Sequence, residues 1–456
     1  MNSKRLLVLY IPIVLFLMFT RTYLRHIPRI SYSYWDEMLW VGRSYFFDFF
    51  VRGDFTNNAW KTYQAYDQPK LTEYAYGAWL YPLYLKEQSK RQEQGFDYTK
   101  FLIINGFYEV DERFEQTYRS YLEEHAGEVA NFLETDDGFR EDYRGKYGDK
   151  SLKTLDLISH ARTINAFLLS GAVVAGYYIL LRLGGLVPAL VFSLSYGFNI
   201  LLVTSGLKAH AEGLFVLLFN ASLLAIIYYF THQNRLRHVI LFSILAGLTV
   251  STKLNGIMVL ISFIVLNLPS VFRKNSKKIR GMLLSHMFLS IVLSLLIFVN
   301  LNPYTFSSPV TKVQDMFDWR MATAGGQANL FQSASLPTPA SRITQIFDNF
   351  YNPERISSFN AFLYAESRVP YSWVLFVLFL GGITSEVIRI KKDQNKAAII
   401  LLVNFFLVLA FMSYYLLLDW NRYYAHLVFF FVYYQSMGLI FYATRGYALI
   451  KPKLKA

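Results

Sequence analysis

The feature that most constrains this chain is a series of long apolar runs, most of them near the length that crosses a lipid bilayer. A helix needs roughly 20 predominantly apolar residues to span a hydrocarbon core of about 30 Å. Ten candidate runs lie at 6–24, 163–181, 186–204, 214–230, 239–251, 257–272, 282–301, 371–388, 397–418 and 423–444. Only 17% of the 456 residues are charged, fewer than a water-soluble domain of this size carries. The sequence therefore predicts an all-α polytopic membrane protein with about ten transmembrane helices.

The basic residues indicate how these helices are oriented. The formal net charge is +13, but much of the excess lies in short tracts between or after apolar runs, at 273–280, 389–392 and 451–455. Such tracts mark cytoplasmic loops. We therefore expect both termini in the cytoplasm of a plasma membrane and no binding of nucleic acid. Lys4 and Arg5 precede the first run without a following small-residue cleavage site, which favours an uncleaved first helix.

This orientation divides the chain into five parts. We expect a first transmembrane helix at 1–24, a large external loop with juxtamembrane helices at 25–160, and transmembrane helices at 161–302. A second external loop follows at 303–370, and 371–456 holds the C-terminal transmembrane helices and a basic cytoplasmic tail. Within the first loop, acidic and basic residues alternate at 111–134, a pattern typical of solvated helix.

One apolar region, 239–272, is too long for a single ordinary span and is interrupted by the polar sequence STKLNG at 251–256. Two short crossings keep the basic tract that follows in the cytoplasm, as the charge rule prefers. Lys253 and Asn255 would then lie somewhat below the outer surface, where irregular backbone persists only if protein or a wet cavity satisfies it.

The adjacent carboxylates Asp36 and Glu37 follow the first span. They precede residues at helical spacing, Trp40, Val41, Tyr45 and Phe49, which predict an amphipathic helix on the membrane surface. A carboxylate held there can take a proton from an acceptor hydroxyl. A solvated surface pair is the alternative interpretation.

A second acidic group, Asp67 and Glu73, flanks a turn marked by Pro69. Carboxylate oxygens are the ligands that hard divalent cations prefer. These two residues are therefore candidate ligands for a metal or a substrate, with a metal ion of unspecified identity as the cofactor. A purely structural loop is the alternative.

Cationic residues at the outer ends of spans supply complementary charge. Lys208, Lys253 and Arg422 are candidates to bind a lipid-linked phosphate leaving group, whose negative charge grows as the bond breaks. An Arg422 pair with Asp419 that merely caps a helix is the alternative for that arginine. The further cavity candidates are His210, Glu212, Asn255 and Tyr423.

Taken in order, these motifs resemble the multi-span glycosyltransferases of the GT-C type. The chain looks like glycosyltransferase family 39, which includes protein O-mannosyltransferases and lipid A aminoarabinose transferases. The resemblance rests on Asp36-Glu37, DQPKL at 67–71, GLTVSTKLNG at 247–256 and WNRYY at 420–424. One departure is Lys70, since relatives often have a second proline in that turn.

The resemblance implies a GT-C fold with Asp36 as the catalytic base candidate and Glu37 beside it. It also implies that Asp67 matches an acidic position that helps bind metal in some members, and that Lys253 and Arg422 contact the donor phosphate. The expected reaction is an inverting transfer of a sugar from a polyprenyl-phosphate donor to a hydroxyl acceptor on protein, lipid or glycan. We expect the site to face outward, among membrane lipids.

No nucleotide cofactor is expected, because the sequence lacks a glycine loop that cradles phosphates. Two alternatives from other classes remain. A lipid or sugar transporter or flippase without transferase activity would have paired broken helices related by a repeat. A non-catalytic assembly protein would have Asp36, Asp67 and Arg422 scattered in space.

Overall fold

A computed structural model describes residues 3–30, 34–91, 94–107, 150–232, 235–272, 277–351, 371–393 and 395–450. Throughout these ranges the regular structure is helical, apart from an isolated antiparallel bridge between Ser335 and Leu418. The predicted all-α class is therefore confirmed. The expected solvated helix at 111–134 lies outside the described residues.

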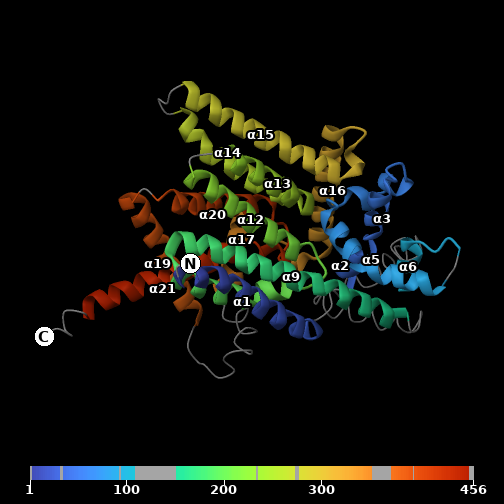
Figure 1. Cartoon of the computed structure of the whole chain (residues 1–456), viewed down its shortest axis with the longest axis horizontal. Helices are drawn as coiled ribbons and strands as arrows, with labels where there is room; N and C mark the ends of the chain where they lie inside the picture. The colour runs from blue at the N-terminus through green and yellow to red at the C-terminus, as the bar shows by residue number, and fades with distance from the viewer. Residues whose placement is uncertain are drawn as a thin grey trace.

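The apolar helices pack side by side into one bundle (Figure 1). They are α1 (Ser3–His26), α9 (Lys150–Gly184), α10 (Leu186–Gly197), α11 (Ile200–Gly206), α12 (Glu212–Thr231), α13 (Leu236–Thr252), α14 (Ile257–Phe272), α15 (Lys277–Leu301), α19 (Tyr371–Asp393), α20 (Lys396–Tyr415) and α21 (Leu427–Ile450). In the described ranges, seven helices are long and apolar enough to cross a membrane. Counting the bent pair α10 and α11 as one span gives eight.

The expected fifth crossing, α13, is not among these helices, because it has only 17 residues. The expected first crossing is the helix α1, which has 24 residues. The expected third crossing is not straight, since α10 and α11 meet at an angle of 56°. Together the helices make a multi-pass membrane protein.

The predicted interruption at 251–256 is confirmed. Helix α13 ends at Thr252, Lys253 is extended, and the short 3-10 helix η3 (Leu254–Gly256) leads into α14. A Cβ on Gly256 would lie 2.6 Å from the backbone carbonyl oxygen of Thr249, so only glycine lets the chain fold back this closely. The break thus holds Lys253 at the end of a span.

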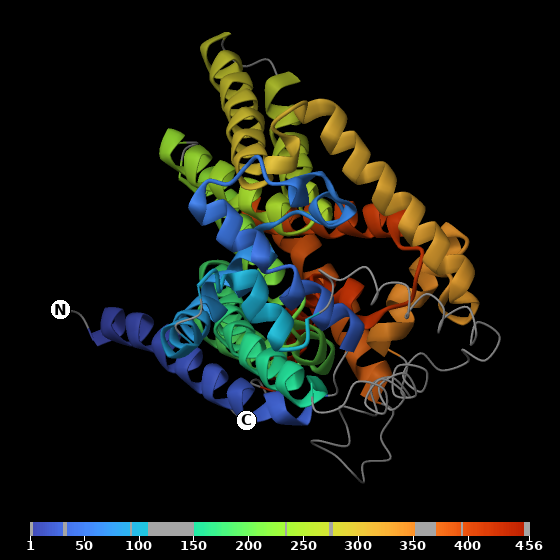
Figure 2. The ribbon, with the colours of Figure 1, turned by 90° about the vertical axis from the view of Figure 1, so that its right-hand side faces the viewer.

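The first outer region forms a second layer at one end of the bundle, onto which Figure 2 looks. Its helices are α2 (Tyr34–Gly42), α3 (Tyr45–Arg52), α4 (Tyr63–Tyr66), α5 (Leu71–Arg91) and α6 (Tyr98–Ile104). The predicted amphipathic helix is two helices, because the chain turns between α2 and α3. Trp40, Val41 and Tyr45 are buried against α5 and α6, so these residues build an outer core and do not lie along a membrane surface.

The second outer region, expected as an external loop at 303–370, includes regular helices. It contains α16 (Pro309–Leu330) and α17 (Pro339–Tyr351). Helix α16 contacts α4, and α17 packs against α19 and α20. The short 3-10 helix η6 (Asn421–Tyr424) precedes α21 and packs against α11.

Candidate active site

Asp36 and Arg422 form an ion pair between the first outer region and the short helix that precedes the last span. Asp36 comes from the first turn of α2, and Arg422 from η6. The guanidinium carbon also lies 4.5 Å from the ring centroid of Trp420 and 5.3 Å from that of Tyr423, which holds its plane in place. Burial raises the pKa of the Asp36 carboxyl, but Arg422, His210 and Lys208 outweigh burial and lower this pKa to about 2.

Glu37 points away from Asp36 into the protein and forms a two-point ion pair with Arg162 of α9. The Arg162 Nε and Nη2 atoms donate to its two carboxylate oxygens at 2.7 and 2.6 Å, and both side chains are buried. Arg162 Nη1 also donates to the carbonyl of Ile30 at 3.0 Å. With both oxygens occupied, Glu37 anchors α2 and is not placed to act as a base.

Glu37 also fixes the loop between α11 and α12. The backbone N–H of Ala209 donates to its Oε1 at 2.7 Å, and Tyr76 donates its hydroxyl to the carbonyl of His210 at 2.6 Å. Lys208 and His210 are therefore held beside Asp36, whose charge acts on both groups. Neither ring nitrogen of the buried His210 makes a hydrogen bond within the described ranges. Burial lowers the pKa of His210, which favours the neutral ring.

Lys253 reaches this cluster from the break between α13 and α14. Its ammonium donates to Glu212 Oε1 at 2.6 Å and lies 5.5 Å from the centroid of the Tyr423 ring. Glu212 Oε2 is 3.8 Å from the Nδ1 atom of His210. The residues predicted at separate span ends therefore share one site.

Asp67 lies between two arginines. Arg43 Nη1 is 2.8 Å from Asp67 Oδ2, and Arg320 Nη1 on α16 is 3.1 Å from Oδ1. Burial raises the pKa of Asp67, but the two guanidinium groups outweigh burial and hold this pKa well below its usual range. The acid that the resemblance linked to metal thus joins the two outer regions.

Lys70, the residue at the position of the missing proline, is fully buried. Its ammonium donates to Glu73 Oε1 at 2.8 Å and to the carbonyl of Gln64 at 2.6 Å, and its N–H donates to Asn302 Oδ1 at 2.9 Å. A proline would lack both donors, so this chain replaces a rigid turn with a buried ion pair. Burial raises the pKa of Glu73 to about 7.

A divalent metal therefore stays a prediction, and its proposed ligands already have cationic partners. Asp67 contacts two arginines and Glu73 contacts Lys70. In the part of the chain that the structure describes, no group of three His, Asp or Glu side chains is arranged to hold a metal ion. With these partners, the two carboxylates do not fit a metal ion.

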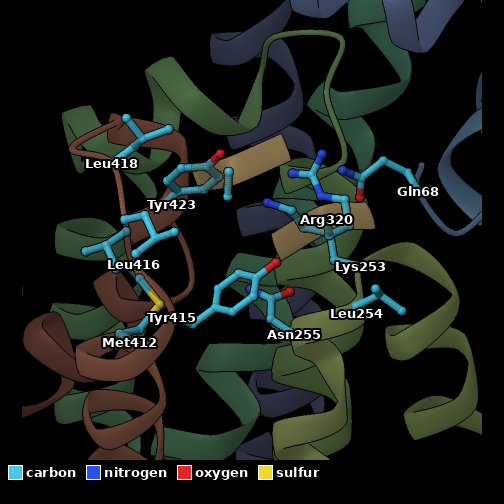
Figure 3. A pocket seen from close by; sticks show the side chains of 12 residues that line it. Gln68, Lys253, Leu254, Asn255, Arg320, Met412, Tyr415, Leu416, Leu418 and Tyr423 are labelled. Atoms are coloured by element: carbon cyan, nitrogen blue, oxygen red, sulfur yellow. The ribbon is translucent and has the colours of Figure 1, made fainter. Parts of the chain in front are cut away.

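A pocket of about 610 Å³ of unfilled space opens beside the ion pairs (Figure 3). Its polar lining residues are Gln68, Lys253, Asn255, Arg320, Tyr415 and Tyr423, and its apolar lining residues are Leu254, Ala324, Met412, Leu416, Leu417 and Leu418. Cationic and apolar surface thus meet in one cavity at the end of the bundle, as an amphiphile with an anionic head group requires.

Asp419 holds the loop that carries Arg422. It accepts hydrogen bonds from Gln345 and Asn349 of α17, at 2.9 and 3.0 Å, and from the Tyr424 hydroxyl at 2.8 Å. The alternative interpretation of Arg422, a capping pair with Asp419, is replaced by the Asp36 pair. Asp419 instead fastens η6 to the second outer region.

Sequence reasoning missed three basic residues, Arg43, Arg162 and Arg320. Arg162 carries a weak signal, because it stands one residue before the second apolar run. Arg43 and Arg320 stand in polar regions rich in other charges, and nothing in their neighbourhood distinguishes them. Only the folded chain brings these three guanidinium groups to the acids.

Comparisons with known proteins find similarity over part of the chain. The family model for dolichyl-phosphate-mannose-protein mannosyltransferase matches residues 145–308. The resemblance drawn from the sequence is confirmed over this segment. The matched segment contains Arg162, Lys208, Glu212 and Lys253. A comparison with curated protein sequences found no match.

Two solved structures of an archaeal oligosaccharyltransferase from Archaeoglobus fulgidus are also similar. One is AglB in complex with an inhibitory peptide and a dolichol-phosphate, with a TM-score of 0.40 and 12% identity over 66% of this chain. The other is the apo form, with a TM-score of 0.34 and 13% identity over 64% of this chain. In each case this chain spans 41% of the length of the solved chain.

Proposed function

We propose that this protein is an integral-membrane glycosyltransferase. It moves one sugar from a polyprenyl-phosphate donor to a hydroxyl acceptor on the outer face of the membrane. The observation that carries the proposal is the contact between Asp36 and Arg422, whose guanidinium lies over Tyr423, a lining residue of the pocket with cationic and apolar walls. This arrangement offers a proton acceptor and a phosphate-binding group within one site.

In the proposed reaction, Asp36 removes the proton of the acceptor hydroxyl while its oxygen attacks the anomeric carbon of the sugar. The bond between that carbon and the phosphate oxygen breaks, and the lipid phosphate leaves with the electron pair. Direct attack from the opposite face inverts the anomeric centre. Arg422, Lys253 and Lys208 are the cations that offset the charge gathering on the phosphate.

Arg422 connects binding of the donor phosphate to the basicity of Asp36. While it pairs with Asp36 alone, the pKa of about 2 makes the carboxylate a weak base. A donor phosphate would draw the guanidinium toward its own oxygens and so weaken its hold on Asp36. We therefore propose that donor binding makes Asp36 more basic.

The family match suggests an acceptor and a sugar to test first. The printed name of the matching family makes a protein hydroxyl the first acceptor to test and mannose the first sugar. Hydroxyls on lipid or glycan remain candidates. The outward orientation of the site rests on the basic tracts that mark the opposite ends of the spans.

A transporter is the second candidate, and one observation favours it. Besides the break between α13 and α14, the pair α10 and α11 is bent by 56°, so the bundle contains two interrupted segments. Broken helices are typical of transport sites. Helices α2 and α16, which carry Asp36 and Arg320, however, lie at one end of the bundle, where a surface reaction needs these residues (Figure 1).

The test uses the full-length protein in lipid vesicles with a panel of radiolabelled polyprenyl-phosphate sugars. We expect label to pass to a hydroxyl acceptor, and the D36N variant to insert and fold normally but lose transfer. Asp315→Asn is the matched control, because Asp315 also lies in an outer region and pairs with a lysine, Lys312. Full transfer by the D36N variant would remove the proposed base, and movement of intact donor across the vesicle would favour the transporter.

A further inference from the structure

We infer that Arg320, on α16, is a binding residue for the donor phosphate and that Asp67 positions it. This inference rests on the proposed function and names a residue of that same site. Arg320 lies beyond the segment that matches the family model, which ends at residue 308. It belongs to the second outer region, which the sequence analysis expected to be an external loop at 303–370.

The first argument is the place of Arg320 in the pocket. Its side chain lines the cavity next to Lys253, and Tyr415 and Tyr423 reach in from the opposite wall (Figure 3). Lys253 comes from the break between α13 and α14, so the two cations belong to different regions of the chain. A phosphate between them would contact both.

The second argument is charge. Asp67 is a single carboxylate that both Arg43 and Arg320 contact, so Arg320 shares this counter-charge with a second guanidinium. Lys253 differs, because the Glu212 carboxylate lies 2.6 Å from its ammonium. An anion in the pocket would stabilise a largely buried guanidinium whose counter-charge is shared.

The third argument is preorganisation. The Arg43–Asp67 pair is almost completely buried and fixes the carboxylate that receives Arg320 Nη1 at 3.1 Å. Gln68, in the amide orientation that satisfies both of its polar atoms, places its oxygen 2.8 Å from the same nitrogen, 3.0 Å from Nε and 3.1 Å from Nη2. One carboxylate oxygen and one amide oxygen cannot engage all five N–H groups of a guanidinium, so donors remain for phosphate oxygens.

The rest of the pocket identifies the kind of phosphate. Asn255 Oδ1 is buried and makes no hydrogen bond within the described ranges, and a sugar hydroxyl would supply its missing donor. Leu254, Met412 and Leu416 offer an apolar wall to a prenyl chain. The ligand is therefore a lipid-linked sugar phosphate, and its phosphate chemistry is shared with free inorganic phosphate.

The experiment compares Arg320→Gln, Arg320→Lys and Asp67→Asn with the wild type, all as full-length protein in lipid nanodiscs. Arg52→Gln is the matched control, because Arg52 pairs with Asp48 and is half exposed away from the pocket. Two readouts are taken: binding of polyprenyl phosphate, with inorganic phosphate as a separate arm, and the KM and kcat for the donor. Thermal unfolding midpoints confirm that each variant is folded.

We expect Arg320→Gln to raise the donor KM and weaken polyprenyl-phosphate binding by about tenfold or more, the effect of losing a charge-assisted hydrogen bond. The kcat should change much less. Arg320→Lys should retain part of the binding, Asp67→Asn should lose part of it, and Arg52→Gln should match the wild type. Inorganic phosphate should bind the wild type more weakly than the lipid phosphate does.

Two failures can be told apart. If the folded Arg320→Gln variant binds and uses the donor as the wild type does, or loses kcat at unchanged KM, the inference is wrong and the proposed function stands. If the wild type does not bind polyprenyl phosphate, the proposed function itself fails. Equal binding of inorganic phosphate and lipid phosphate by the wild type would overturn the lipid-linked assignment.

Discussion

Glu37 and Arg162 form a buried, two-point ion pair, and this pair sets the direction of the neighbouring Asp36. Consecutive side chains on a helix diverge by about 100°. When Glu37 turns inward to α9, Asp36 must turn sideways, toward Arg422. The adjacent acids therefore have different roles: Glu37 holds the helix and Asp36 faces the site.

Replacing Glu37 by Gln should destabilise the protein strongly. The change leaves the Arg162 charge buried without its partner, which typically lowers the free energy of unfolding by about 3–5 kcal/mol. Transfer should fall as well, because α2 loses its anchor. Thermal unfolding in detergent measures the first effect and donor turnover the second.

The matched control for this pair is the double variant Glu37→Gln with Arg162→Met. Removing both charges should restore part of the lost stability, since no lone charge stays buried. If Glu37→Gln alone unfolds at the wild-type temperature, the pair does not anchor α2.

Replacing Arg422 by Gln should move the acid limb of the pH–rate profile to higher pH. Burial raises the pKa of Asp36, and Arg422 is the main group that lowers it to about 2. Without that charge the pKa rises, so Asp36 is ionised, and able to accept a proton, only at higher pH. The profile of kcat/KM against pH measures this shift.

Arg422→Lys is the control because it keeps the charge but loses the planar fork. Its acid limb should lie nearer to that of the wild type, even if its donor KM rises. Identical acid limbs in the wild type and in Arg422→Gln would show that Asp36 does not set the profile.

Replacing Glu73 by Gln should remove one component of the pH dependence of stability. Burial raises the pKa of Glu73 from 4.5 to about 7, so between these values the folded protein binds a proton that the unfolded chain releases. This group's contribution to stability is present below pH 4.5 and is lost as the pH rises toward 7. Unfolding midpoints from pH 4 to 8 should fall less steeply in the variant, and parallel curves would contradict the assignment.

Replacing Gly438 by Ala should force α19 and α21 apart. A Cβ at this position would lie 1.7 Å from the carbonyl oxygen of Leu378, and backbone cannot move aside as a side chain can. Overpacking of this kind usually costs about 1–3 kcal/mol or more. The control is Gly446→Ala on the same helix, where a Cβ would meet nothing within 4 Å. Equal unfolding midpoints for the two variants would contradict this packing.

The sequence by itself determined the class of the fold and some of the residues at its candidate site. Runs of apolar residues predict membrane helices because the thickness of the bilayer fixes the length of a spanning helix. The polar sequence STKLNG predicts a break because polar residues cannot continue an apolar span. The basic tracts predict the orientation on which the proposed outward site depends. Asp36, Lys253 and Arg422 were named from these local patterns alone.

Only the tertiary structure decided how those residues pair. Neighbours in sequence have different partners: Asp36 contacts Arg422, whereas Glu37 contacts Arg162. The sequence did not identify Arg320 as a site residue, because an arginine in a polar segment has no periodicity or spacing that sets it apart. Ion pairs between distant segments depend on how helices pack across the whole chain, and packing is a property of the folded molecule that local pattern does not encode.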